Sequence, residues 1–378
     1  MLEKFSSCGI FLIGANIKTM ENGRNSLHKS ACRGHIEDVK NLIKNGANIH
    51  IKDKYGKTSL HLAAQGGHIE IVKFLIEKDA NIDAVNMYDN TSLHYAAEED
   101  HIKVVKYLID KGANIGAVDD LGDTSLHKAV WFEHIEVAKY LIDKGANIDA
   151  VANSGDTSLH MAAYRGDIEI AKYLIDKGAN IDAVRNNGDT SLHIAALGGN
   201  IEVVKYLIEK GANIDVVNND GITSLHNAAL GRHIEVVKYL IDKGANINIK
   251  YKYGNTLLHL AVEGGHIGVV KYLIEKDANI DAVNDAGNTS SRKAALGVPI
   301  EVVKYLIDKG ANINIRDKYG NTLLHLAAEE GNIVVVKYLI DNGANINIKD
   351  KYGNTFLHLA AEGGHIEVVK YLIDKGAN

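Results

Sequence analysis

Residues 155–184 read GDTSLHMAAYRGDIEIAKYLIDKGANIDAV, and closely similar stretches recur every 33 residues along most of the 378-residue chain. A Leu-His pair fixes the register, because its histidines are 33 residues apart without an insertion. These histidines are His28, His61, His94, His127, His160, His193, His226, His259, His325 and His358, with Arg292 in the one missing slot. Such a period is typical of a solenoid, in which each unit buries its apolar face only against its neighbours.

Each unit is predicted to form two short helices joined by a turn. Thr157 can accept hydrogen bonds from the first turn of a helix, and His160 stands three residues later, where a capping-box side chain reaches back to the helix start. Gly166 is expected to end that helix, since glycine readily adopts the left-handed conformation. Asp167 then begins the second helix. The stripe predicted to be buried on the second helix consists of Ile168, Ala171, Leu174 and Ile175.

The segments TSLHxAAxxG, IEVVKYLI and DKGANI resemble the ankyrin repeat, in eleven units over about residues 23–378. The resemblance implies an all-α solenoid of stacked helix-turn-helix units with projecting β-hairpin loops. It also implies an inner helix that lines a concave groove and an outer helix on the convex back. One departure is systematic, because the family usually has proline after the threonine, whereas most units here have serine, as at Ser158. Proline pre-sets the first helical turn, so we expect the same fold with slightly less rigidity.

A repeat array grows along one axis without a central core, so residues 23–378 are predicted to form one elongated domain. Residues 1–22 are interpreted as a decayed half-repeat that acts as an N-terminal cap, because FLIGANI at 11–17 reproduces the YLI and GANI of later units. The alternative for the apolar stretch 8–15 is a signal peptide. No other apolar run approaches the length needed to cross a membrane.

The ninth unit, about residues 281–313, is degenerate. Ser291 replaces the core leucine, Arg292 replaces the histidine, and Pro299 stands where histidine or asparagine usually opens the second helix. Removing a buried leucine side chain costs on the order of 2 to 5 kcal/mol, and the serine hydroxyl needs a partner. We therefore expect the first helix of this unit to be loosened, and we hypothesise a hinge there.

Composition and residue periodicity argue against several functions. The formal net charge is −6, whereas a nucleic-acid surface needs concentrated basic residues. Cys8 and Cys32 make no disulfide framework, so a reducing, cytoplasmic location fits best. Of the 18 histidines, ten cap first helices and seven begin second helices, which leaves only His50. The sequence therefore predicts no metal, no cofactor, no catalytic residues, no membrane or nucleic-acid partner, and a monomer.

The irregular positions are the candidates for recognition. Trp131 is the only tryptophan, and Phe132 follows it at two positions where most other units have small or charged residues. The resemblance places both on the groove side, and exposed aromatic residues and arginine are enriched at binding hot spots. The alternative is that both rings fold over the adjoining unit and fill a gap. The candidate partner-binding residues are Met87, Tyr88, Glu98, Glu99, Leu121, Trp131, Phe132, Met161, Tyr164, Arg165, Leu197 and Leu230.

Together these features predict a non-enzymatic scaffold that binds another protein in the concave groove around units three to seven. The alternative is a passive spacer or recruiting arm for an activity carried by another polypeptide. The chain is rich in Lys, Asn, Ile and Tyr, and it resembles the long, near-identical ankyrin arrays of intracellular bacteria, large DNA viruses and protozoa. That resemblance implies a host-directed effector whose target lies in the host cytosol.

Overall fold

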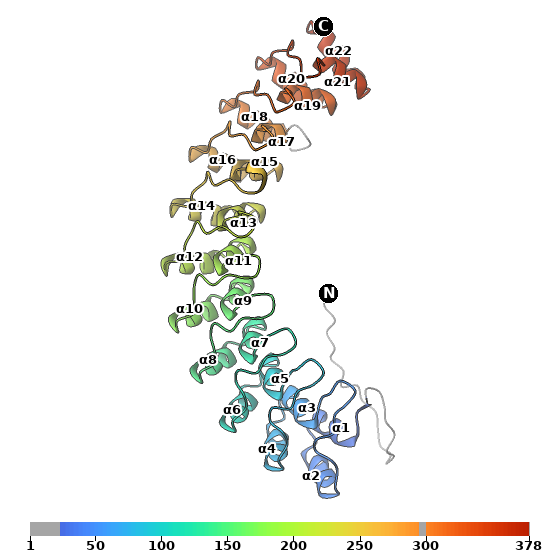
Figure 1. The fold of residues 1–378 in the computed structure, drawn as a ribbon, viewed down its shortest axis with the longest axis vertical. Coiled ribbons are helices and arrows are strands. Elements are labelled where there is room, and N and C mark those ends of the chain that lie inside the picture. The colour runs from blue at the N-terminus through green and yellow to red at the C-terminus, as the bar shows by residue number, and fades with distance from the viewer. Residues whose placement is uncertain (1–22, 295–299, 378) are drawn as a thin grey trace. The chain divides into compact units, whose positions relative to one another are not determined.

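The computed structural model describes residues 23–294 and 300–377. The chain falls into two compact units, Met1–Asn186 and Asn187–Asn378, and each is described by itself. In both units a first helix alternates with a second helix of nine residues (Figure 1). The predicted N-terminal cap, residues 1–22, lies outside the described residues.

The helices of the first unit are α1 (Ser26–Arg33), α2 (Ile36–Lys44), α3 (Ser59–Gln65), α4 (Ile69–Glu77), α5 (Ser92–Glu98), α6 (Ile102–Asp110), α7 (Ser125–Trp131), α8 (Ile135–Asp143), α9 (Ser158–Arg165) and α10 (Ile168–Asp176). The second unit contains α11 (Ser191–Gly198), α12 (Ile201–Glu209), α13 (Ser224–Leu230), α14 (Ile234–Asp242), the 3-10 turn η2 (Lys252–Gly254), α15 (Leu257–Glu263), α16 (Ile267–Glu275), α17 (Ser290–Ala294), α18 (Ile300–Asp308), α19 (Leu323–Glu329), α20 (Ile333–Asp341), α21 (Phe356–Glu362) and α22 (Ile366–Asp374).

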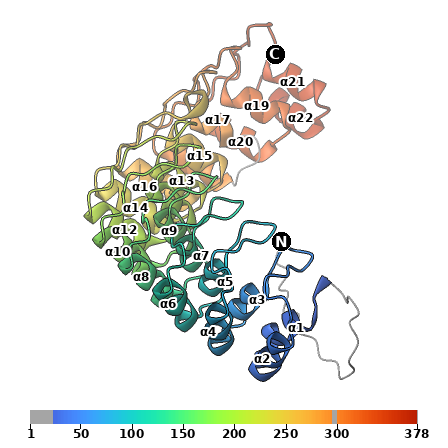
Figure 2. The ribbon, with the colours of Figure 1, turned by 60° about the horizontal axis from the view of Figure 1, so that its bottom comes forward.

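Within each unit the helices form two layers. Successive first helices pack on one another, as α3 does on α5 and α5 on α7, and successive second helices form the other layer. This arrangement confirms the predicted all-α solenoid of paired helices. The connecting loops of the first unit project to one side of the helices (Figure 2). Among the described residues these loops contain only isolated antiparallel bridges, such as Val118 with Thr124, so the expected hairpins are tight turns.

The predicted capping boxes are present at the ten first helices that have a capping histidine. At α5, the amide of Thr91 donates to Nδ1 of His94 at 3.1 Å, and the hydroxyl oxygen of Thr91 accepts from the amide of His94 at 3.5 Å. The two residues thus satisfy donors at the helix start that have no partner inside the helix. The same box occurs at Asn25 and His28, where asparagine replaces threonine.

The capping histidines also join one repeat to the next. Nε2 of His61 lies 3.1 Å from the carbonyl oxygen of Asn90, and Nε2 of His94 lies 3.1 Å from that of Asp123, each 29 residues further along the chain. Because Nδ1 already accepts an amide hydrogen, Nε2 carries the ring proton and donates it to the carbonyl. Each of these neutral imidazoles therefore closes a helix with one nitrogen and holds the following loop with the other.

A second set of histidines links repeats in the opposite direction. Nε2 of His68, at the start of α4, lies 3.0 Å from the carbonyl oxygen of Cys32. His101 and His134 make the corresponding contacts with the carbonyls of Gln65 and Glu98, at 3.0 and 2.8 Å. These carbonyls lie at the end of the preceding first helix, where backbone acceptors lack partners within the helix.

The loops are joined directly through their backbones. Oδ1 of Asp53 accepts from the amides of Tyr55 and Lys57, both at 2.9 Å, which closes a tight turn. The amide of Met87 in the next loop then donates to the carbonyl of Tyr55 at 2.9 Å. One such bond joins each successive pair of loops in most of the first unit, so the loops are held together as well as the helices.

The second helices bury a stripe that differs from the prediction. In α10 the buried side chains are Ile170, Ala171 and Leu174, whereas Ile168 and Ile175 are only half-buried. The helix packs against its own first helix, α9, and against the preceding second helix, α8. The buried face is therefore rotated toward position 170, and Ile168 and Ile175 lie at its edges.

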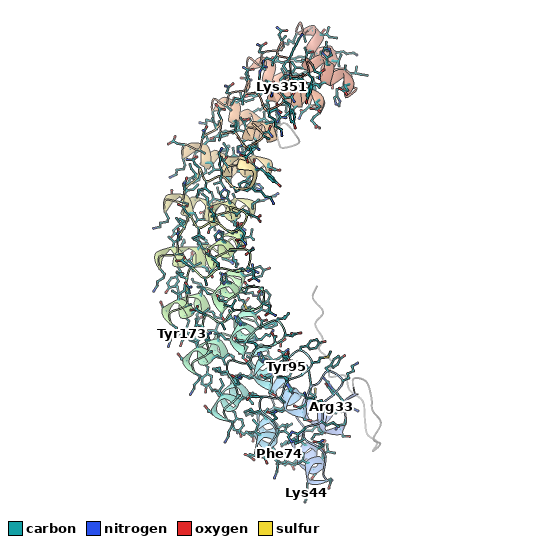
Figure 3. The ribbon with its side chains drawn as sticks, in the orientation of Figure 1. Arg33, Lys44, Phe74, Tyr95, Tyr173 and Lys351 are labelled. Carbon is teal, nitrogen blue, oxygen red and sulfur yellow. The ribbon has the colours of Figure 1, made fainter. Side chains whose placement is uncertain are left out.

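The opposite face of the second helices carries polar links between repeats. The hydroxyl of Tyr173 and Nζ of Lys177 both donate to Oδ1 of Asp143 at 2.7 Å. Figure 3 shows Tyr173 on the side of the second helices, while Tyr95 lies among the first helices. Exposed ion pairs of this kind add little individually, so the histidine and backbone links remain the main polar connections.

The degenerate repeat keeps its forward link by other means. Nη1 of Arg292 lies 3.5 Å from the carbonyl of Asn321, again 29 residues ahead, and Nη2 lies 2.8 Å from Oδ2 of Asp317. Ser291 is buried, its hydroxyl has no hydrogen-bond partner among the described residues, and it lines a cavity of about 10 Å³. The link is thus ionic instead of neutral. The hinge remains a hypothesis, and Pro299 lies outside the described residues.

The serine after each capping threonine offers a test of the missing proline. Ser158 is buried, and its hydroxyl has no hydrogen-bond partner among the described residues. Thr157 before it is extended, with φ −98° and ψ 169°, which suits a following proline. Ser158→Pro should raise the free energy of unfolding by about 1 kcal/mol, because it removes a buried unsatisfied hydroxyl and pre-sets the first turn.

Urea denaturation measures this change, and Ser158→Ala is the matched control that removes only the hydroxyl. Both variants should be more stable than the parent, with the proline variant the more stable of the two. Destabilisation by proline in a chain that tolerates alanine would show that the first turn does not have room for the ring.

The buried histidines predict a loss of stability in acid. Burial lowers the pKa of His61, His226 and His325 from 6.5 to about 4. Between these values the unfolded chain binds protons that the folded chain does not, so stability falls as the pH falls from about 6.5 to about 4. Each such histidine lowers the free energy of unfolding by on the order of 3 kcal/mol over that pH range.

The urea midpoint measured from pH 7 to pH 4 checks this. His61→Gln is the matched control, because glutamine can occupy the same capping-box position but cannot titrate. It should be less sensitive to pH than the parent chain. A midpoint that stays constant down to pH 4.5 would contradict neutral, buried imidazoles.

Candidate binding surface

The end of α7 carries the largest aromatic residues at the irregular positions. Trp131 is the last residue of this helix and Phe132 is its C-cap. The side chains are 40% and 44% exposed, respectively, so neither ring is buried between the helices. Glu133 follows with φ 63°, in the left-handed region that residues other than glycine rarely adopt.

The indole of Trp131 is stacked on the next repeat. Its ring lies 5.6 Å from the ring of Tyr164 with an interplanar angle of 14°, and the Arg165 guanidinium carbon lies 5.9 Å from its centroid. Nε of Arg165 donates to Oε1 of Glu133 at 2.6 Å. Trp131 does fold over its neighbour, yet much of it stays exposed, and Tyr164 is 60% exposed. The ring thus packs on the adjoining repeat and is also partly exposed, and its role in partner binding stays a prediction.

Phe132 connects this group to the preceding repeat. Its ring stacks on His134 with centroids 6.2 Å apart and an interplanar angle of 16°. His134 in turn contacts the carbonyl of Glu98, and its Nδ1 lies 4.0 Å from Oδ1 of Asp100. The ends of α5, α7 and α9 therefore form one continuous surface. We call it the aromatic–acidic patch, and it consists of Glu98, Glu99, Asp100, Trp131, Phe132, Glu133, Tyr164 and Arg165.

Lysines beside the patch already have partners. Nζ of Lys128 lies 2.6 Å from Oδ2 of Asp119 and 2.9 Å from Oδ2 of Asp123. Lys57 donates to Gln65 at 3.1 Å and lies over the ring of Tyr95, which Figure 3 places among the first helices. Burial raises the pKa of the Glu98 carboxyl, and Lys128 lowers it only in part. Glu98 therefore has an incompletely compensated charge.

Three other predicted residues lie in a separate group at the loop tips. Met87, Tyr88 and Leu121 are exposed there, while their backbones or neighbouring amides join successive loops. A first helix of about seven residues separates these tips from the patch, which corresponds to roughly 10 Å along the helix axis. The candidates in the first unit therefore form two groups instead of one strip.

Met161 is buried, contrary to the expectation from sequence. It was expected to extend an apolar strip on the inner face, but its side chain is only 8% exposed. Its position in α9 corresponds to Tyr95 in α5 and Leu62 in α3, both buried where neighbouring first helices pack together. Leu197 and Leu230 are exposed as expected, but they belong to the second unit and are not placed relative to the patch.

Sequence reasoning missed Glu133 and Asp100. Both adopt positive φ, 63° and 58°, at a loop position where seven other repeats have a glycine with positive φ. A left-handed conformation costs an L-residue roughly 1 to 2 kcal/mol. The signal was present in the sequence, because both residues interrupt a regular glycine. Strained backbone of this kind clusters at functional sites.

In the described parts of the chain, no group of three or more His, Cys, Asp or Glu side chains could hold a metal ion. The helices in the same residues are all too short or too polar to span a bilayer.

Stacked helix pairs joined by projecting loops define a helical repeat protein. Models of the family described as ankyrin repeats (3 copies) match residues 3–86, 149–218, 210–284 and 291–378, and a model of ankyrin repeats (many copies) matches residues 93–142. The chain belongs to the ankyrin repeat family. Ankyrin repeat domains are generally protein–protein interaction modules, and the family is typically non-enzymatic.

Solved structures similar to this chain include two ankyrin repeat domains. The ankyrin repeat domain of human ASB11 has 30% identity and a TM-score of 0.53, with 57% of this chain and 98% of that one covered. The ankyrin repeat domain of Bcl-3, a member of the IκB protein family, has 28% identity and a TM-score of 0.52, with 58% and 100% covered. No curated protein matches the chain.

The strained backbone of Glu133 can be tested with a closely matched control. Arg232 occupies the same loop position three repeats later and has nearly the same φ, 65°. Glu133→Gly and Arg232→Gly should each raise the free energy of unfolding by about 1 kcal/mol, because glycine adopts this conformation without strain. Only Glu133→Gly should change the emission spectrum of Trp131, since it alone releases Arg165.

Trp131 is the sole tryptophan of the chain, so its fluorescence reports on the patch without labelling. Equal spectra for the parent and both variants would show that Glu133 does not hold Arg165 beside the indole. A loss of stability in Glu133→Gly alone would show that the ion pair outweighs the backbone strain.

Proposed function

We propose that the chain is a non-enzymatic scaffold that binds a partner protein on the face formed by its first helices and loops, with the aromatic–acidic patch at the centre of the contact. The observation that carries the proposal is the partial exposure of Trp131, Phe132 and Tyr164 at the ends of two adjacent first helices, α7 and α9. Tryptophan, tyrosine and arginine are the residues most often found at binding hot spots.

The construction of the patch supports the same conclusion. The patch is held by contacts between repeats, namely the stacked Trp131 and Tyr164 rings and the Arg165–Glu133 pair. Side chains that are already ordered lose less conformational entropy when a partner binds. The family's general role as protein-binding modules agrees with this assignment.

The proposal also covers the oligomeric state, the location and the type of partner. We propose that the chain acts as a monomer in the cytoplasm, or in the host cytosol if it is a host-directed effector, and that its partner is a protein and not a nucleic acid. The net charge of −6 supports the last point, because nucleic-acid binding requires a concentrated basic surface.

Truncation of the aromatic residues tests the function. Trp131→Ala or Phe132→Ala should each weaken partner binding by about 2 kcal/mol or more, because hot-spot residues contribute at least this much. Partners are first captured with the full chain and identified by mass spectrometry, and affinities are then measured by calorimetry with the purified partner.

Tyr352→Ala is the control, since Tyr352 is also exposed but belongs to the second unit and is not part of the patch. It should leave the affinity unchanged. If both aromatic variants bind as tightly as the parent and remain folded, the patch is not the contact. Binding that requires only the ends of the array would instead favour the spacer.

A further inference from the structure

We propose that the aromatic–acidic patch recognises a basic segment of its partner, in which lysine or arginine side chains flank an apolar or aromatic residue. This inference rests on the proposed function and specifies the chemistry of the partner. The charged residues around the rings carry this inference, whereas the exposure of the rings identified the patch.

The charges on the patch are strongly unequal. Four carboxylates, Glu98, Glu99, Asp100 and Glu133, lie at or beside the helix ends, against the single cation Arg165. That cation is paired with Glu133, as its Nε donates to Oε1 at 2.6 Å. The other three carboxylates, at the end of α5, make no ion pair with a lysine or arginine among the described residues. Glu99 accepts from Nε2 of Gln65 at 3.5 Å, and Oδ1 of Asp100 lies 4.0 Å from Nδ1 of His134.

The nearby lysines offset the charge of Glu98 only in part, because both have closer partners. Lys128 lies within 3 Å of two other carboxylates, those of Asp119 and Asp123. Lys57 is held by Gln65 and by the face of Tyr95, at 4.0 Å from the ring centroid. Counting these groups, six carboxylates face three cations, so the surface keeps an excess of three negative charges.

The aromatic rings favour the same type of partner. Arg165 already lies near the face of Trp131, which shows that this surface accommodates a guanidinium beside the indole. The ring of Tyr164 is stacked on Trp131 and is 60% exposed, so it enlarges the accessible aromatic surface. A cation over an aromatic ring gains more when water is partly excluded, and the carboxylates of the patch would attract the same cation. An apolar side chain between the cations would cover Phe132.

The half-buried Glu98 adds to the electrostatic complementarity. Its carboxylate is partly desolvated by the ends of the first helices, and burial raises its pKa. A partner ammonium or guanidinium group close to this carboxylate would favour its charged form and so offset the cost of burial. Negative surfaces of this kind select basic partners and speed their association at low salt.

The test uses a random twelve-residue peptide library displayed on phage and panned on the full chain. The library is first depleted on a Trp131→Ala/Phe132→Ala variant, so that the remaining binders depend on the patch. Peptides selected from it are synthesised, and their dissociation constants are measured at low and high salt. Circular dichroism establishes that each variant keeps the helical fold of the parent.

The expected result is a set of peptides enriched in Lys and Arg around one aromatic or aliphatic residue. Their affinity should fall about tenfold in Glu98→Gln/Glu99→Gln, which removes two charges without changing side-chain size, and the difference should shrink at high salt. Trp131→Ala alone should weaken them about 30-fold, the equivalent of a hot-spot contribution.

Other outcomes separate this inference from the function beneath it. Peptides that need Trp131 but lack basic enrichment, or that ignore the glutamine substitutions and salt, would overturn the basic-partner inference and leave the binding function intact. Acidic peptides would likewise overturn it. A failure to recover any peptide whose binding depends on Trp131 would contradict both the inference and the proposed contact surface.

Discussion

The structure depends on a neutral imidazole that uses both of its nitrogens. Nδ1 of each capping histidine accepts the amide of the residue that begins the helix, and in most repeats Nε2 reaches a carbonyl in the following loop. The same side chain thus defines where a helix starts and how far away the next repeat lies. Most buried polar groups in proteins are hydrogen-bonded. Both ring nitrogens are satisfied in this way at His28, His61, His94, His127, His193 and His259.

This constraint separates two kinds of residue. The regular residues are committed to holding repeats together, through the capping histidines, the histidines that reach backwards and the backbone links between loops. Substitutions at those positions change the stack itself, as Arg292 does when it replaces a neutral link with an ion pair. The irregular residues at the helix ends are not needed for stacking. Glu133 even adopts a strained, positive φ at a position where most other repeats have glycine, which adopts this φ without strain.

Much of the fold could be predicted from the sequence because the repeat shows the same local chemistry many times. The Thr157–His160 cap, the end of the helix at Gly166 and the start of the next at Asp167 all agree with the structure. The failures concern contacts between repeats, which spacing within one helix does not reveal. The buried face includes Ile170 instead of Ile168, and Met161 is covered by neighbouring first helices.

The candidate site was predictable only in part for the same reason. Trp131 and Phe132 were found because their residue types are unusual, and both are exposed. Glu133 was missed because its importance depends on φ and on the pairing with Arg165 from the next repeat. The stacking of Trp131 on Tyr164 likewise joins positions 33 residues apart.

Nitrogen NMR of the chain labelled at histidine tests the central interaction most directly, because long-range proton–nitrogen correlations distinguish the two neutral tautomers and the charged form. At pH 7 the capping histidines should carry their proton on Nε2, with Nδ1 unprotonated, and His61, His226 and His325 should remain neutral at pH 5, consistent with pKa values of about 4. Protons on Nδ1 at neutral pH, or charged rings at pH 5, would contradict an imidazole that both caps its helix and joins the next repeat.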